Sequence, residues 1–189
     1  MYDATPDPYC YPGTTVLKNR LGLSDQAALD AFEADVVTQR GTEPLPAGRF
    51  SPSHFRAVHR HLFQDVYSWA GRHRTVRIAK DGSMFCYPEH IDAQLRSLFG
   101  WLRDHDHLAG LDAASFARQG AHFLGELNAI HAFREGNGRT QMAFFAMLAD
   151  RSGHPFDLGR LDPEKFLAAM ILSFNGDETE LTRQIENLT

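Results

Sequence analysis

Nine consecutive residues, 131 to 139, carry most of the chemistry that this sequence offers. They read His-Ala-Phe-Arg-Glu-Gly-Asn-Gly-Arg. The imidazole of His131 can accept a proton near neutral pH, and the carboxylate of Glu135 is the kind of oxygen donor that Mg²⁺ prefers. Gly-Asn-Gly alone is a common turn, but few structural loops also need a base, a carboxylate and a guanidinium. The segment therefore predicts a reaction site.

The second half of this segment is suited to binding phosphate. Gly136 and Gly138 allow positive φ angles, so the N–H groups near Asn137 can face an anion at the start of the following helix. The positive charge of Arg139 is unfavourable at the positive end of that helix's dipole, and an anionic ligand would offset this repulsion. In this arrangement the carboxylate binds a Mg²⁺ that the phosphates share, and the imidazole is the general base for an attacking hydroxyl. Phe133 is expected to anchor the loop in the core.

The elements that hold this segment are predicted to be helices. Apolar residues recur at helical spacing along most of the chain, and Asp25, Ser51 and Asp112 stand where N-cap residues are favoured. We expect helices over residues 26–39, 52–63, 88–102, 113–130, 140–151, 163–174 and 178–188.

One stretch departs from the helical pattern. Between Arg74 and Tyr87 the apolar residues alternate, and Asp81-Gly82 is a strong signal for a hairpin turn. The sequence therefore predicts an all-α helical bundle with one β-hairpin, about 74–87, in a single domain spanning residues 1–189.

Composition excludes several classes of protein. The chain has 189 residues and a formal net charge of -5, which gives no global attraction to nucleic acid or an anionic membrane. Cys10 and Cys86 form no CxxC pair, and histidines such as His54 and His59 lack metal-binding spacing, so we expect them scattered on the surface. The chain has no apolar run of about 20 residues and no signal-peptide pattern at its start, so the expected location is cytoplasmic.

The nine residues resemble the signature of the Fic family, His-Pro-Phe-x-(Asp/Glu)-Gly-Asn-Gly-Arg-x-x-Arg. The likeness extends to the opening Tyr11-Pro-Gly-Thr, the Tyr67-Ser-Trp-Ala-Gly stretch and Ser173-Phe-Asn-Gly-Asp. It implies a helical core, a hairpin flap, and Mg²⁺-dependent transfer of AMP from ATP to a Ser, Thr or Tyr hydroxyl of a target protein.

Site roles are also implied by position. His131 resembles the family's base, Glu135 its metal carboxylate, and residues 136–139 its phosphate-binding site. The flap resembles the element that adds the target's main chain as an extra strand, and its docking residues are Thr75, Val76, Ile78 and Lys80.

Two positions depart from the signature, and one further motif matches. Ala132 replaces proline, and Met142 replaces the second arginine, which in the family reaches the terminal phosphate and pairs with an inhibitory glutamate. Residues 182–187, TRQIEN, fit the family's inhibitory motif and make Glu186 a candidate inhibitory residue. A separate small antitoxin is the other source of such a glutamate.

Three hypotheses follow. The first is an AMP transferase acting as a bacterial toxin or effector. The second is an impaired relative that binds nucleotide or target without turnover, because Met142 replaces an arginine. The third is a relative that uses a different nucleotide-linked donor.

Overall fold

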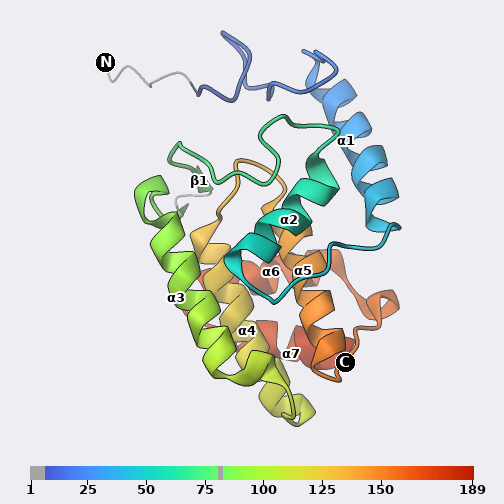
Figure 1. Cartoon of the computed structure of the whole chain (residues 1–189), viewed down its shortest axis with the longest axis vertical. Coiled ribbons are helices and arrows are strands. Elements are labelled where there is room, and N and C mark those ends of the chain that lie inside the picture. The colour runs from blue at the N-terminus through green and yellow to red at the C-terminus, as the bar shows by residue number, and fades with distance from the viewer. Residues whose placement is uncertain (1–6, 81–82) are drawn as a thin grey trace.

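Two helices, α4 (Ala113–Ile130) and α5 (Asn137–Arg151), run through the middle of the computed structural model and carry the loop 131–136 between them (Figure 1). The structure describes residues 7–80 and 83–189. Around this pair lie α1 (Gln26–Gly41), α2 (Pro52–Phe63), α3 (Ile91–Asp104), α6 (Pro163–Phe174) and α7 (Thr179–Leu188), with 3₁₀ turns at Pro88–His90, Asp106–Leu108 and Leu158–Arg160. Helix α4 contacts α3, α5, α6 and α7, and α2 contacts both α1 and α5.

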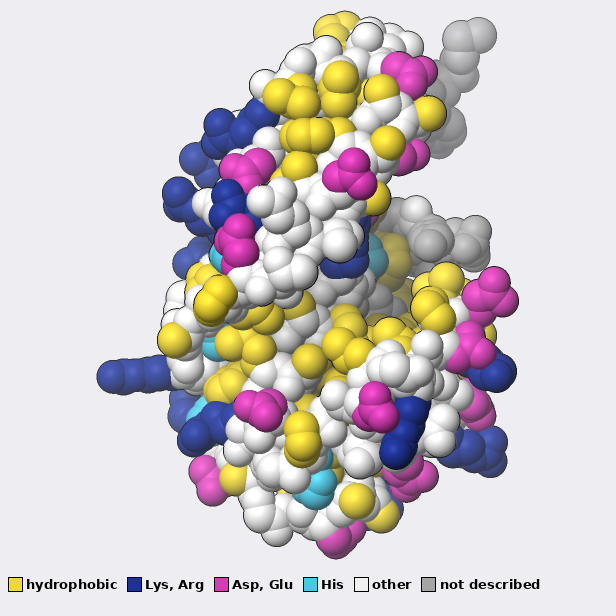
Figure 2. Space-filling view, turned by 90° about the vertical axis from the view of Figure 1, so that its right-hand side faces the viewer, with side chains coloured by type: hydrophobic (Ala, Val, Ile, Leu, Met, Phe, Trp, Pro, Cys, Tyr) yellow, Lys and Arg dark blue, Asp and Glu magenta, His cyan; other side chains and the backbone are white. Residues whose placement is uncertain are grey.

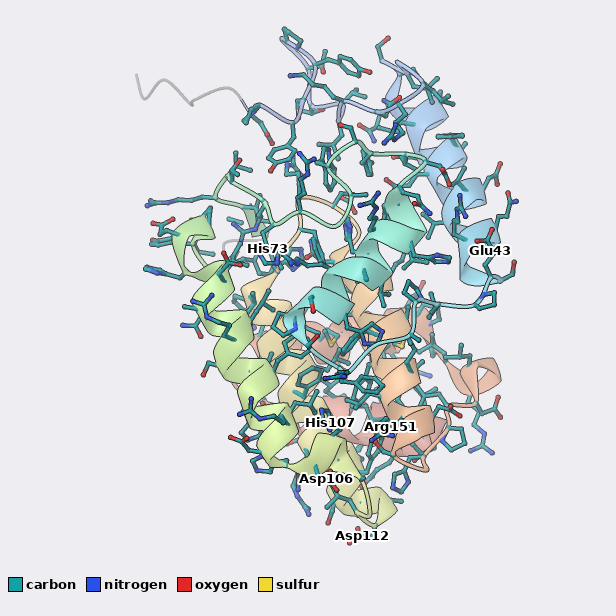
Figure 3. All side chains as sticks on the ribbon, in the orientation of Figure 1. Glu43, His73, Asp106, His107, Asp112 and Arg151 are labelled. Atoms are coloured by element: carbon teal, nitrogen blue, oxygen red, sulfur yellow. The ribbon has the colours of Figure 1, made fainter. Side chains whose placement is uncertain are left out.

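The helices begin close to where the sequence predicts. The side chains of Asp25, Ser51 and Asp112 each accept a hydrogen bond from the N–H three residues on, as N-cap residues do. Asp112, at the lower end of α4 in Figure 3, sets the start of the helix that leads up to the loop. The prediction for α5 was wrong at its start, because this helix begins at Asn137 and not at residue 140.

A cluster of phenylalanines joins four of the helices. Phe55 of α2, Phe99 of α3 and Phe144 of α5 contact one another with ring centroids 5.5–6.1 Å apart, and Phe123 of α4 lies 5.6 Å from Phe99. Each such ring buries roughly 150–250 Å² of surface. The middle turns of α4 and α5, the two helices that carry the loop, are therefore anchored in the main core.

The stretch predicted as a hairpin is largely irregular. Its strands are β1 (Ala79–Lys80) and β2 (Ser83–Met84), which pair antiparallel, and the N–H of Phe85 donates to the Ile78 carbonyl at 3.3 Å. Residues 74–78 and 85–87 form no strand, so the expected hairpin over 74–87 is reduced to this short pair. The expected turn, Asp81-Gly82, lies outside the described residues.

Both cysteines are free thiols. In the described parts of the chain, no helix is long and apolar enough to cross a bilayer.

Candidate active site

The loop between α4 and α5 begins and ends on residues with left-handed backbones. His131 follows α4 with φ 47° and ψ 61°, and Gly136 precedes α5 with φ 77°. A Cβ on Gly136 would lie 2.3 Å from the ring of Phe63, so both conformation and space require glycine there. Gly138 differs from our prediction, because it lies inside α5 and is not among the glycines with positive φ.

A closed set of hydrogen bonds fixes the middle of this loop. The Asn137 amide oxygen accepts from the Phe133 N–H at 2.9 Å, and the Asn137 amide nitrogen donates to the Phe133 carbonyl at 2.8 Å. Phe133 is fully buried, as predicted. Because the Asn137 side chain is occupied in this way, the group that Asn137 can offer to an anion is its main-chain N–H, together with those of the next two residues in the first turn of α5.

His59 of α2 ties the loop to the neighbouring turn. The Gly71 N–H donates to Nδ1 of His59 at 2.9 Å, so Nε2 carries the proton and donates to the Glu135 carbonyl at 3.0 Å. The ring stacks on Phe133 at 3.8 Å. Burial lowers the pKa of His59 to about 4, so the ring is neutral near pH 7. The expectation that His54 and His59 lie on the surface was wrong, since both are buried.

The imidazole of His131 is oriented by an aromatic contact. It stacks on Phe85, which follows β2, with centroids 3.9 Å apart and planes 19° from parallel. The main-chain carbonyl of His131 accepts a hydrogen bond from Arg74 Nε at 2.8 Å. Packing on one side and a main-chain hydrogen bond on the other therefore hold the left-handed histidine, a conformation that costs roughly 1–2 kcal/mol.

Charged groups meet at the start of α5. Arg139 Nη2 lies 2.5 Å from Glu33 of α1 and 3.3 Å from Glu135, and the guanidinium lies over the Phe63 ring. Glu33 also accepts a hydrogen bond from the Tyr67 hydroxyl. Burial and Glu33 raise the pKa of Tyr67, which therefore stays protonated and donates. Glu135 also accepts from the Gly136 N–H at 2.8 Å.

The loop and the start of α5 line a cavity of about 780 Å³. Its polar wall includes His131, Glu135, Gly138 and Arg139, and its remaining wall is mostly apolar and comes from α4, α5 and α6. Figure 2 shows hydrophobic side chains gathered along a hollow of the surface, beside basic and histidine side chains. A charged end and an apolar wall suit a ligand with a phosphate part and a flat apolar part.

Three further side chains line the cavity. Met142 stands where the family signature has an arginine, Asn128 belongs to α4, and Arg134 pairs with Asp7 at 2.8 Å. Neither Arg134 nor Asn128 was among the predicted site residues.

Other predicted site residues lie elsewhere. Glu186 is exposed on α7, and no residue of α7 lines the cavity, so the structure does not bring it to the site. Of the flap residues, Thr75 donates its N–H to the Tyr9 hydroxyl at 3.2 Å, and the Val76 carbonyl accepts from Arg74 at 2.7 Å. Ile78 precedes β1, and Lys80 pairs with Ser83.

Sequence reasoning missed three residues that hold the site: Glu33, His59 and Arg74. The signal for His59 was available, because it lies four residues after Phe55 and four before Phe63 on the apolar face of α2. Glu33 and Arg74 reach the loop through contacts that no local pattern encodes.

Comparison with known proteins identifies the family. Residues 49–149 match the Fic/DOC family profile. The chain belongs to the Fic/DOC family. The protein named probable protein adenylyltransferase y4lH of Sinorhizobium fredii is 48% identical over 188 residues, which cover 99% of this chain and 98% of that protein. Protein adenylyltransferase VbhT of Bartonella schoenbuchensis is 38% identical over 192 residues, which cover all of this chain and 40% of VbhT.

Solved structures of Fic proteins match the fold. The structure of BepC from Bartonella tribocorum with bound AMPPNP has a TM-score of 0.85 and 26% identity, covering 95% of each chain. The Fic domain of a Bartonella quintana protein with bound ADP has a TM-score of 0.84 and 27% identity, covering 95% of this chain and 93% of that one.

Proposed function

We propose that this Fic protein transfers AMP from ATP to a side-chain hydroxyl of another protein. One observation carries the proposal: His131, Glu135, Arg139 and the first turn of α5 face a single cavity with an apolar wall. The adenylyltransferase names of the relatives support the same activity.

The chemistry follows from the positions of these groups. The hydroxyl oxygen of the target attacks the α-phosphorus of ATP, and His131 takes the hydroxyl proton. The bond from the α-phosphorus to the bridging oxygen breaks, and pyrophosphate leaves with the electron pair. The N–H groups of Asn137, Gly138 and Arg139 and the Arg139 guanidinium stabilise the negative charge on the phosphates.

Among the described residues that line the cavity, Glu135 is the one carboxylate. Within residues 7–80 and 83–189, no three His, Cys, Asp or Glu side chains gather as ligands. Glu135 is 43% exposed at the charged end of the cavity, which fits a Mg²⁺ held mainly by nucleotide phosphates and water. When bound, Mg²⁺ would neutralise phosphate charge and hold the phosphates in one orientation.

The segment from Thr75 to Lys80 is our proposed docking site for the target chain. Val76 and Ile78 lie on the arm before β1, and Phe85 on the opposite arm stacks on His131. A target strand pairing along this arm would present a Ser, Thr or Tyr hydroxyl near the base.

A second candidate function rests on Met142. This side chain lines the cavity where the family signature has an arginine. A thioether cannot donate a hydrogen bond to a phosphate, so a protein that binds nucleotide but turns over slowly, or that uses another nucleotide-linked donor, is the alternative.

We also propose how the protein is inhibited and where it acts. Because Glu186 is exposed on α7, we favour a separate small antitoxin over self-inhibition as the source of an inhibitory glutamate. Such inhibition would suit a toxin or effector that acts in the cytoplasm.

The activity is tested by incubating the purified protein with ATP, Mg²⁺ and a bacterial lysate, followed by mass spectrometry of the lysate proteins. We expect AMP on Ser, Thr or Tyr side chains with the natural protein and none with His131→Ala. Equal modification by both proteins would refute the assignment of the base, and no modification by either would favour the second candidate function.

A further inference from the structure

A buried arginine, Arg74, lies against the backbone of the proposed general base. It is 2% exposed, although arginine is rarely buried without a carboxylate partner. In the described parts of the chain, its guanidinium hydrogen-bonds only to main-chain carbonyl oxygens. No residue pattern around position 74 predicts this arrangement.

The carbonyl oxygens belong to two parts of the site. At the end of α4, Nε donates to His131 at 2.8 Å and Nη2 donates to Ile130 at 3.3 Å. On the docking segment, before β1, Nη1 donates to Val76 at 2.7 Å, and on the facing arm, after β2, Nη2 donates to Cys86. The guanidinium therefore joins the docking segment and the facing arm to the C-terminal end of α4.

Three further contacts fix the same region. The Arg74 N–H donates to the Ala132 carbonyl at 2.9 Å, and the Cys86 N–H donates to the Ala129 carbonyl at 3.1 Å. His73, labelled in Figure 3 beside α3, pairs with Asp92 of that helix at 2.9 Å. The chain leading into the docking segment is thus held at positions 73 and 74, and the facing arm at position 86.

The end of a helix explains why a positive charge is stable here. The last carbonyl groups of α4 have no N–H partners within the helix, and the helix dipole makes this end negative. Burial lowers the pKa of Arg74, yet an arginine side chain stays protonated in proteins. The five N–H groups of a planar guanidinium can serve several carbonyls at once, which a lysine ammonium cannot do with the same geometry.

We propose that Arg74 is a positioning residue that sets the docking segment in register with His131. Its bond to the His131 carbonyl holds the left-handed backbone that directs the imidazole onto Phe85. Its bond to Val76 fixes the docking segment, along which the target would pair, and its bond to Cys86 fixes the facing arm that carries Phe85. The position of the acceptor hydroxyl relative to the base therefore depends on this one guanidinium.

The contacts of Arg74 separate this role from nucleotide binding. None of its hydrogen bonds reaches Glu135, Arg139 or the first turn of α5. Loss of the guanidinium should therefore lower the transfer rate and leave ATP affinity unchanged. A displacement of about 1 Å in a reacting group can cost on the order of 100-fold in rate.

The test compares Arg74→Lys and Arg74→Gln with Arg103→Lys, a control on α3 whose natural side chain is 70% exposed. Calorimetry gives the Kd for ATP, and incorporation of α-labelled ATP into lysate proteins gives the transfer rate at saturating ATP. We expect both Arg74 variants to transfer about 10- to 100-fold more slowly with a Kd within about twofold of the natural value. The Arg103 variant should match the natural protein in both measurements.

Two results would overturn the proposal. One is an unchanged transfer rate in an Arg74 variant. The other is a parallel loss of rate and ATP affinity, including a complete loss of ATP binding, because Arg74 would then support the fold as a whole.

The inference rests on the proposed function, so a second measurement does not depend on activity. Ring-current shielding by Phe85 should move the His131 ring protons upfield in the NMR spectrum, where loss of signals in His131→Ala assigns them. In Arg74→Lys we expect these signals to move downfield, and in Arg103→Lys to stay in place. Unshifted signals in Arg74→Lys would refute the positioning role even if no AMP transfer is found, whereas absence of transfer by the natural protein counts only against the proposed function.

Discussion

Met142 lies in the cavity wall three residues after Arg139, so both side chains project toward the same side of α5. The family signature has an arginine at this position. Replacing Met142 with arginine should therefore add a guanidinium that can reach the terminal phosphate of ATP.

The expected gain in ATP affinity follows from the surroundings of Met142. A hydrogen bond to a charged group is worth about 1.5–3 kcal/mol. Met142 is only half-buried, so solvent screens a charge there, and the new side chain also loses apolar contacts with the wall. The lower end of the range, about 1.5 kcal/mol, corresponds to roughly 10-fold tighter binding of ATP.

Calorimetry with ATP and AMP, using Met142→Arg and the apolar control Met142→Leu, tests this reasoning. We expect the arginine variant to bind ATP roughly 10-fold more tightly and AMP with unchanged affinity, because AMP has no terminal phosphate to contact. Met142→Leu should behave as the natural protein does. Adding Glu186→Gly to Met142→Arg should change nothing, since Glu186 is exposed on α7. Unchanged ATP affinity, or an equal gain for AMP, would refute the contact.

Three further predictions concern residues at the loop. His131→Ala should lower the transfer rate by about 10²- to 10⁴-fold and leave the Kd for ATP unchanged, because the base acts on the incoming hydroxyl; weaker ATP binding in calorimetry would contradict this. Glu135→Ala should weaken ATP binding in Mg²⁺ but not in chelator, and an equal loss in both would argue against a metal role. The pKa of His59 is about 4 in the folded protein, against an ordinary value of 6.5, so protonation favours the unfolded chain. The free energy of unfolding should therefore fall by about 3 kcal/mol as the pH is lowered from 6.5 to 4. Chemical denaturation of His59→Gln should show a free energy of unfolding that depends less on pH. Some slope should remain from His73, because burial also lowers its pKa. A pH dependence as steep as that of the natural protein would count against a neutral, buried His59 ring.

The parts of the fold that the sequence predicts well are local. N-cap residues such as Asp112 act on an N–H three residues away, and helical spacing reports the buried face of each helix. The loop residues also sit in one continuous stretch, so their types and spacing could be interpreted without knowing the fold. The start of α5 was misplaced, because the Gly-Asn-Gly sequence indicates a turn while Asn137 and Gly138 form the first helical residues. Helix α3 also begins later than predicted, at Ile91, after a 3₁₀ turn over Pro88–His90.

The support for the loop was not predictable in this way. Arg74 bonds to a carbonyl 57 residues away, Glu33 pairs with an arginine 106 residues away, and His59 reaches a carbonyl 76 residues away. Such partners are set by how helices pack, which a single sequence does not display. The prediction of a hairpin over 74–87 was wrong for a related reason. The alternation of apolar residues there suggests strands, but Arg74 takes the Val76 and Cys86 carbonyls that a regular ladder would use.

We propose that this Fic protein moves the α-phosphate of ATP, with its nucleoside, onto a protein hydroxyl. The most direct measurement is a parallel incubation of the purified protein with a bacterial lysate, Mg²⁺ and ATP labelled at either the α or the γ phosphate. Our account predicts that protein-bound label appears only from the α position, with release of pyrophosphate, and disappears with His131→Ala. Protein-bound label from the γ position would contradict the account.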